Sequence, residues 1–166
     1  MALDCDNFYL MPLELENIDE NDRRILRALQ TDATRSLEVL ADMLSLSTNA
    51  VWRRIKRLEA AGVIARRVAL IDPEKVGLGM TVFVGVKTSD HSEEWLEQFA
   101  RASTALPEVV EIYRLAGETD YMLKLLVRDV ADYDRVYRKL IDAVKMSDVS
   151  ASFAMEKLKF DTAVPI

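Results

Sequence analysis

The segment SLEVLADMLSLSTNAVWRRIKRLEAAG, residues 36–62, decides the fold of the first part of the chain. It holds two runs of apolar residues at helical spacing, and the short turn Ser45-Leu46 separates them. Ser36 and Ser47 stand where helix N-caps are expected, and Gly62 stands where the second run ends. Two short helices joined by so tight a turn predict a helix-turn-helix unit.

A further helix is expected upstream of this pair. It begins at Asp19, where several acidic side chains favour a helix N-terminus. The three helices together predict a DNA-binding domain over residues 18–63. Residues 1–17 have no clear period, and we interpret them as an N-terminal extension.

The helix that follows Ser47 has one apolar face and one polar face. At 100° per residue Val51, Ile55 and Leu58 face the core, and we expect Arg54 at the core edge to pair with an acid of the first helix. Asn and Arg side chains near the start of such a helix can contact base edges, and basic residues further along can bind phosphates. The expected DNA-binding residues are Ser36, Ser47, Thr48, Asn49, Trp52, Arg53, Lys56 and Arg57. For Trp52, packing against Arg53 or the first helix is the alternative.

Charge is distributed unevenly along the chain. The 166 residues have a formal net charge of −6, with a pI of about 4.9. Residues 51–67 nevertheless hold six Lys or Arg side chains and only one acid, Glu59. Because fields decay within about 10 Å in salt, this local basic stripe matters more to a polyanion than the net charge does. The alternative interpretation of the stripe is an ordinary solvated helix face.

Composition argues against several classes of protein. One cysteine, Cys5, cannot form an internal disulfide, and one histidine, His91, cannot build a histidine-rich metal site. Zinc fingers, iron–sulfur clusters and a Cys/His catalytic pair within one chain are therefore not expected. No apolar run approaches the roughly 18–20 residues of a membrane helix, and residues 1–17 contain no Lys or Arg. We therefore expect a cytoplasmic protein. No Gly-rich phosphate loop, Ser/His/Asp set or metal-spaced carboxylate cluster stands out, so we expect no enzyme, cofactor or metal.

The second half of the chain alternates strand and helix patterns. Before it, residues 63–71 are predicted to form a strand, and residues 64–79 serve as a strand and hinge linker. Residues 80–166 follow the order βαββαβ, with strands predicted at 80–88, 109–116, 121–127 and 149–160 and helices at 92–105 and 130–144. The fold class is thus α+β: a helix-turn-helix domain followed by a ferredoxin-like βαββαβ domain.

The predicted sheet has more apolar strand positions than one face can use. Val82, Val84, Leu123, Leu125 and Phe153 contribute to this excess. Two helices cover only one face, so a second copy of the chain is expected to cover the other. The sequence therefore predicts a homodimer.

Several motifs in this order resemble the Lrp/AsnC (feast/famine) family of transcriptional regulators. They are residues 36–41 and 46–64, the hinge DPEKVG at 72–77, the loop GETDY at 117–121 and the ending SFAME at 152–156. The DecR-type subgroup is most similar, through RVALIDPEK at 67–75. The resemblance implies a winged-helix-type domain that binds promoter or operator DNA, a domain that binds a small amino-acid effector, and dimers that often assemble into octamers.

The loop between the second and third strands is the candidate effector site. Gly117 permits an unusual turn, amides around Thr119 can hold a carboxylate, and Asp120 can hold an ammonium group. Ser152 of the last strand could close the pocket, from the same subunit or another. The residues alone also fit an ordinary hairpin loop in which Asp120 bonds only its own backbone; the resemblance favours the pocket.

Two other functions remain open at this stage. Sirohaem decarboxylases have a similar two-domain layout but act on a tetrapyrrole. Such an enzyme is expected to use a histidine near its substrate, and His91 is the single candidate. An amino-acid sensor without DNA binding is the other, and the basic stripe argues against it. The sequence favours a DNA-binding regulator.

Overall fold

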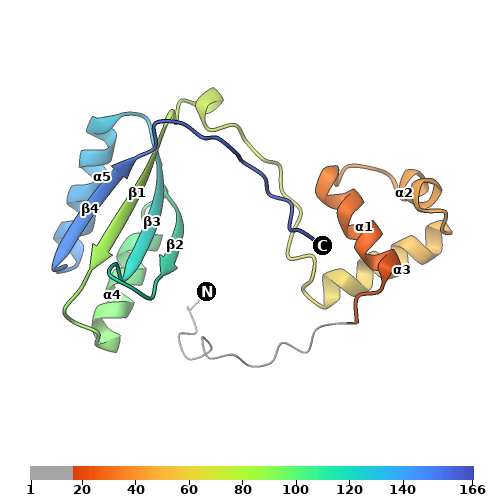
Figure 1. Cartoon of the computed structure of the whole chain (residues 1–166), viewed down its shortest axis with the longest axis horizontal. Helices are drawn as coiled ribbons and strands as arrows, with labels where there is room; N and C mark the ends of the chain where they lie inside the picture. The colour runs from red at the N-terminus through yellow and green to blue at the C-terminus, as the bar shows by residue number, and fades with distance from the viewer. Residues whose placement is uncertain (1–16) are drawn as a thin grey trace. The chain divides into compact units, whose positions relative to one another are not determined.

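The computed structural model describes residues 17–166, which form two compact units. The first unit comprises the described residues up to Ala69 together with Phe160–Ile166, and the second comprises Leu70–Lys159 (Figure 1). Most of the N-terminal extension expected at residues 1–17, including Cys5, lies outside the described residues.

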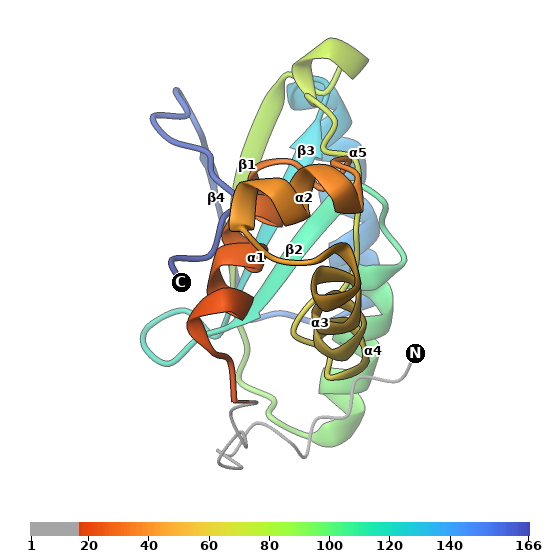
Figure 2. The ribbon, with the colours of Figure 1, turned by 90° about the vertical axis from the view of Figure 1, so that its right-hand side faces the viewer.

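Three helices form the first unit: α1 Glu20–Thr31, α2 Leu37–Leu44 and α3 Thr48–Ala60 (Figure 2). The predicted caps are confirmed, because the Ser36 hydroxyl accepts from the Val39 amide and the Ser47 hydroxyl accepts from the Ala50 amide. Such caps satisfy backbone amides that have no partner inside a helix. Ser45, with φ at 55°, makes the turn between α2 and α3.

The core of this unit is apolar and shared by all three helices. It consists of side chains that are at most 9% exposed: Ile25, Ala28, Leu40, Ala41, Leu44, Val51 and Ile55. Val51 and Ile55 of α3 were predicted from the helical spacing to face the core. Leu58, the third residue predicted to do so, is also buried. The amphipathic pattern of α3 is therefore confirmed.

The prediction of a strand at residues 63–71 is wrong. Residues 65–71 have no regular secondary structure, and Val68, Leu70 and Ile71 are 60–66% exposed. A strand is stabilised by pairing with a neighbour, and no strand of the described chain pairs with this segment. No β-hairpin wing follows α3 in the described residues; a short 3₁₀ turn, η2 Glu74–Val76, precedes the second unit.

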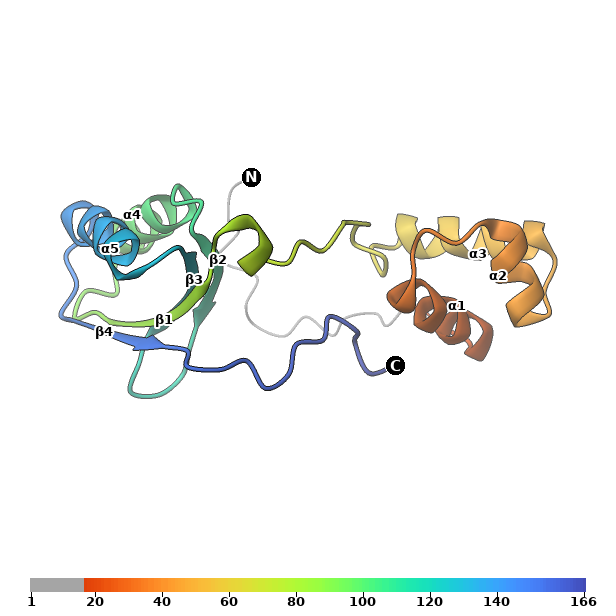
Figure 3. The same cartoon turned by 90° about the horizontal axis from the view of Figure 1, so that it is seen from above.

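The second unit has the predicted βαββαβ order. Its elements are β1 Met80–Lys87, α4 Glu93–Thr104, β2 Val109–Arg114, β3 Tyr121–Val127, α5 Val130–Ala143 and β4 Asp148–Phe153. The sheet order is β2-β3-β1-β4 with every pair antiparallel, and α4 and α5 cover one face (Figure 3). The predicted α+β class and ferredoxin-like topology are confirmed.

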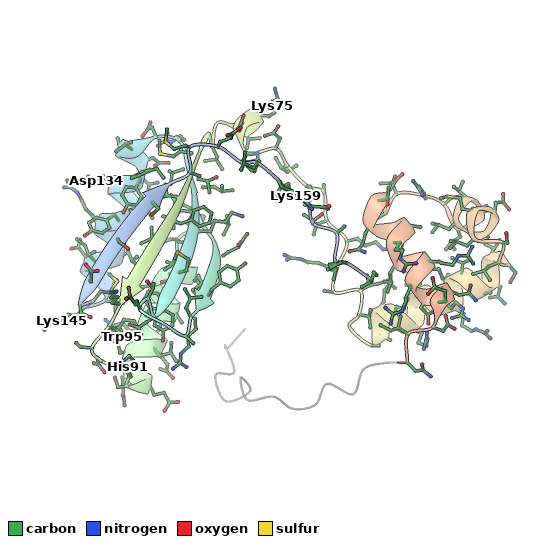
Figure 4. The ribbon with its side chains drawn as sticks, in the orientation of Figure 1. Lys75, His91, Trp95, Asp134, Lys145 and Lys159 are labelled. Atoms are coloured by element: carbon green, nitrogen blue, oxygen red, sulfur yellow. The ribbon has the colours of Figure 1, made fainter. Side chains whose placement is uncertain are left out.

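An aromatic cluster joins α4 to the sheet. The ring centroids of Trp95 and Phe99 are 5.0 Å apart, and Tyr121 packs within 5.6 Å of both rings. The indole N–H of Trp95 donates to the carbonyl of Lys145 at 2.7 Å, and Figure 4 labels both residues at the same end of the unit. A buried indole is thus both packed and hydrogen-bonded.

The apolar residues that suggested a second buried face lie on the helix-covered face instead. Val82 and Val84 of β1 pair in register with Leu125 and Leu123, and Phe153 packs edge-on against Tyr133 of α5 at 5.3 Å. The opposite face, here called the open face, is mixed in polarity. Its members are Thr81, Phe83, Gly85, Glu111, Tyr113, Met122, Lys124, Leu126, Ser150 and Ser152.

The chain after β4 also differs from the prediction. The last strand ends at Phe153 rather than Phe160, because no neighbouring strand continues the ladder. Residues 160–166 belong to the first unit, where the Gln30 side chain both donates to and accepts from the backbone of Val164. The expected second domain, residues 80–166, therefore includes a tail that the contacts assign to the first unit.

Candidate nucleic-acid interface and effector loop

The outer face of α3 carries the expected DNA-binding side chains. Ser47, Thr48, Asn49, Trp52, Arg53 and Lys56 are all exposed, and Trp52 retains 49% of its surface. Arg53 has no hydrogen bond or ion pair within the described residues. An exposed arginine in the second turn of such a helix can make two hydrogen bonds to a guanine edge.

Lys56 lies one turn further along α3. Its ammonium group is 2.8 Å from Glu59 Oε2, and Arg67 holds the other carboxylate oxygen of Glu59 at 3.0 Å. These hydrogen bonds and charges lower the pKa of Glu59, with the contact from Lys56 as the larger cause. Exposed ion pairs contribute little to stability, so Lys56 can exchange Glu59 for a phosphate at small cost.

Two other arginines of α3 turn away from this surface. Arg54 pairs with Asp19 at 2.7 Å and with Asp22 at 2.8 Å. The predicted pairing of Arg54 with an acid of the first helix is therefore confirmed. Arg57 was expected to contact DNA, but its guanidinium lies 2.5 Å from Asp22 and also donates to the carbonyl of Asn17. The attraction of a buried carboxylate is the physical reason for this direction.

The candidate effector loop, residues 115–120 between β2 and β3, is a hairpin connection held to β1. Gly117 has φ at 144°, a conformation that favours glycine. The amide of Asp120 donates to the carbonyl of Val86, and its Oδ2 accepts from the amide of Thr88 at 2.8 Å. Asp120 therefore bonds the end of β1 rather than only its own loop, while Oδ1 has no hydrogen-bond partner within the described residues.

Two residues beside the loop were missed by the sequence analysis. A Cβ atom placed on Gly85 would lie 2.9 Å from the Ser150 hydroxyl and 3.3 Å from the Thr119 methyl group. The structure therefore brings Thr119, Gly85 and Ser150 together on the open face, and the predicted Ser152 lies two positions further along β4. The alternation of β4 would have identified Ser150, had its register with β1 been known.

Residues 17–166 hold neither a candidate metal cluster nor a membrane-spanning helix, and their one histidine is exposed. Among the described residues, no group of three or more His, Cys, Asp or Glu side chains could hold a metal ion. No helix in residues 17–166 is long and apolar enough to cross a membrane. His91 is exposed in the loop before α4, where the amide of Ser92 bonds the neighbouring Asp90 (Figure 4).

Family models match both units of this chain. Residues 18–59 match the AsnC-type helix-turn-helix domain, and residues 81–164 match the Lrp/AsnC ligand binding domain. The chain belongs to the Lrp/AsnC family. The resemblance noted from the sequence motifs is confirmed, and this Lrp/AsnC protein is a DNA-binding transcriptional regulator.

Named relatives and solved structures agree with this assignment. The glutamate uptake regulatory protein of Zymomonas mobilis is 50% identical over 152 residues, which cover 92% of this chain and 93% of the relative. The DNA-binding transcriptional activator DecR of Escherichia coli K12 is 47% identical over 150 residues, covering 90% and 99%. These matches give no support to the sirohaem-decarboxylase alternative.

Two crystal structures resemble this Lrp/AsnC regulator over most of its length. An AsnC-family regulator from Agrobacterium tumefaciens is 48% identical, with a TM-score of 0.86 over 89% of this chain and 96% of that one. A transcriptional regulator from Neisseria meningitidis in complex with L-methionine is 32% identical, with a TM-score of 0.84 over the same shares.

Proposed function

We propose that the outer face of α3 reads the major groove of promoter or operator DNA. Asn49, Trp52 and Arg53 contact base edges or thymine methyl groups, and Lys56 contacts phosphate. The hydroxyls of Ser36 and Ser47 accept capping bonds and keep their protons for phosphate oxygens. Thr48 lies beside them. Because Arg57 is bound to Asp22, we leave it out of the contact set.

We infer that a free amino acid binds at the effector loop. Asp120 Oδ1 holds its ammonium group, and the loop amides around Thr119 hold its carboxylate. Gly117 admits the ligand to the backbone, while Ser150 and Ser152 line the adjoining sheet. The observation that carries this proposal is the convergence of Thr119, Gly85 and Ser150, with Asp120 next to Thr119 in the chain and only its Oδ2 hydrogen-bonded within residues 17–166.

We infer that two copies pair through the C-terminal domains and that such dimers assemble further, up to an octamer. The open face holds Phe83 and Tyr113 at 39% and 52% exposure, and the segment before β1 leaves Leu70 and Ile71 exposed. A dimer presents two recognition helices to two half-sites, as palindromic operators require. The proposed boundaries are a DNA-binding domain at 18–63, a linker at 64–79 and an effector domain from 80 onward. The protein acts in the cytoplasm, where its DNA lies.

A gel shift and a light-scattering measurement on the same sample test these proposals. DNA from upstream of the gene for this protein is titrated in a gel shift, with and without each amino acid, and L-methionine is tested first because a relative binds it. We expect a shift that at least one amino acid changes. Light scattering on the same sample is expected to give a mass at least twice 18.8 kDa. A monomer, or a shift that no amino acid affects, would contradict the corresponding proposal.

A further inference from the structure

A single buried carboxylate joins α1 to α3. Asp22, in the first turn of α1, has no solvent-exposed surface. Its Oδ1 is 2.8 Å from Arg54 Nη1, and its Oδ2 is 2.5 Å from Arg57 Nη2. The same Oδ2 accepts from the amide of Asp19, which completes a capping box at the start of α1. Asp22 therefore links α3 to α1 and to the N-cap residue of α1.

The two arginines stand one helical turn apart on α3, so they bind Asp22 from neighbouring positions of one helix face. The other contacts between the start of α1 and α3 are the ion pair of Arg54 with Asp19 and the apolar core cluster that includes Ile25, Val51 and Ile55. Apolar packing does not depend strongly on direction, whereas charge-assisted hydrogen bonds do. Asp22 therefore limits rotation of α3 about its axis more than the apolar core does.

The rotation of α3 sets the direction of the DNA-contacting side chains. Arg53 precedes Arg54, and Lys56 precedes Arg57, so each inward arginine has an outward basic neighbour about 100° away on the helix. Holding Arg54 and Arg57 against Asp22 points Arg53 and Lys56 outward. We propose that Asp22 is a positioning residue for DNA recognition, which rests on the proposed role of the outer face of α3.

Charge gives Asp22 a second effect on specificity. Its carboxylate keeps Arg57 on α1, although the arginine side chain is 42% exposed. Without that ion pair, a nearby phosphate would compete better for Arg57, and such a contact carries no sequence information. Asp22 therefore strengthens specific binding by orienting α3 and limits non-specific binding by holding Arg57.

The test is Asp22→Asn in the full chain, with Asp132→Asn as the matched control. Asp132 has the same local chemistry in the second unit: it is buried, lies in the first turn of α5 and pairs with Arg128 and Arg135. The probes are DNA from upstream of the gene and random-sequence DNA, each titrated over a range of salt concentrations. The readout is the ratio of the two dissociation constants and the slope of affinity against salt.

For Asp22→Asn we expect the specificity ratio to fall by about tenfold or more, out of the 10³–10⁷ typical of such proteins. The salt slope on random DNA is expected to steepen by about one, because Arg57 gains a phosphate. Asp132→Asn is expected to change neither quantity. A folded Asp22→Asn protein with an unchanged ratio would overturn the proposal, because loss of stability alone lowers the active fraction on both DNAs equally.

A second variant decides the matter if circular dichroism shows that Asp22→Asn does not fold. Arg57→Gln keeps a hydrogen-bond donor for Asp22 but removes the charge. We expect its salt slope to match that of the parent, since Arg57 does not touch DNA, while its specificity ratio falls. A slope smaller by about one would place Arg57 on phosphate and refute the proposal. A parent protein that shifts no DNA would instead count against the proposed role of α3.

Discussion

The carboxylate of Asp120 accepts a hydrogen bond from the backbone amide of Thr88, at 2.8 Å, across the ends of β3 and β1. This bond fixes one oxygen of the proposed ammonium-binding group before any ligand arrives. Preorganisation of this kind reduces the ordering cost of binding. The same residue therefore has a structural role and a proposed binding role, and substitutions can separate the two.

Replacing Asp120 by Asn is expected to keep the bond to Thr88, because an amide oxygen also accepts, but to remove the charge. Effector affinity should fall by about 1.5–3 kcal/mol, the contribution of a hydrogen bond to a charged group. Asp120→Ala loses both functions and is expected to be less stable as well. Isothermal titration calorimetry with the effector found by gel shift measures the affinity. Equal affinity in Asp120→Asn and the parent would show that the loop is only a turn.

Gly85→Ala should disturb the effector site more than the fold. The new Cβ would lie 2.9 Å from the Ser150 hydroxyl, which can rotate, and 3.3 Å from the Thr119 methyl group, which belongs to the loop. We expect about tenfold weaker effector binding, equal to 1.4 kcal/mol, and a smaller loss of unfolding free energy.

Two further variants control this result. Gly79→Ala has nothing within 4 Å of its new Cβ and is expected to behave as the parent does. The double variant Gly85→Ala with Ser150→Gly removes the closest clash and should recover part of the affinity. Calorimetry measures the effector affinity, and urea unfolding measures the stability. A large loss of stability with normal effector binding would contradict the prediction.

Arg53→Ala and Lys56→Ala should weaken DNA binding in different ways. Loss of a base contact at Arg53 is expected to cost about 1–3 kcal/mol on the specific site and to relax specificity. Loss of a phosphate contact at Lys56 should weaken binding to all sequences alike and reduce the salt slope by about one. Gel shifts at several salt concentrations measure both, with the exposed Arg101→Ala of α4 as the charge-matched control. Unchanged shifts for both variants would refute the assignment.

The ion pairs of Asp132 are expected to make the stability of the second unit sensitive to acid. Hydrogen bonds from Arg128, and then from Arg135, hold the pKa of Asp132 well below its ordinary value of 3.8. A carboxyl with a lowered pKa stabilises the folded state above that ordinary value, and this contribution is lost as the pH falls below 3.8 toward the folded pKa. Asp132→Asn should therefore be less stable than the parent at pH 7, and the difference should shrink below pH 3.8.

The stability difference is measured by urea unfolding at pH 7 and at pH 3. Unfolding is monitored by the fluorescence of the buried Trp95, in a Trp52→Phe background. A stability difference that is the same at both pH values would indicate that Asp132 contributes through packing rather than charge.

Local chemistry allowed much of the first unit to be predicted. The caps at Ser36 and Ser47 and the inward face of α3 depend on residues within one or two turns, so spacing alone identifies them. The pairing of Arg54 with an acid of α1 was also predictable, because the helical spacing places Arg54 at the edge of the core. The order of strands and helices in the second unit followed from the same kind of periodicity.

Long-range geometry decided the rest. The direction of Arg57 depends on Asp22, 35 residues earlier in the chain. Strand alternation separates the two faces of β1 and β4 but does not say which is covered, and a change of one residue in register exchanges them. For this reason the apolar strand positions were expected to need two buried faces, and Ser150 was missed. The sequence by itself determined the elements, the recognition helix and the family. Only the tertiary structure decided which charges lie on the outer face of α3 and which residues meet at the candidate effector loop, because those contacts join segments that no local pattern relates.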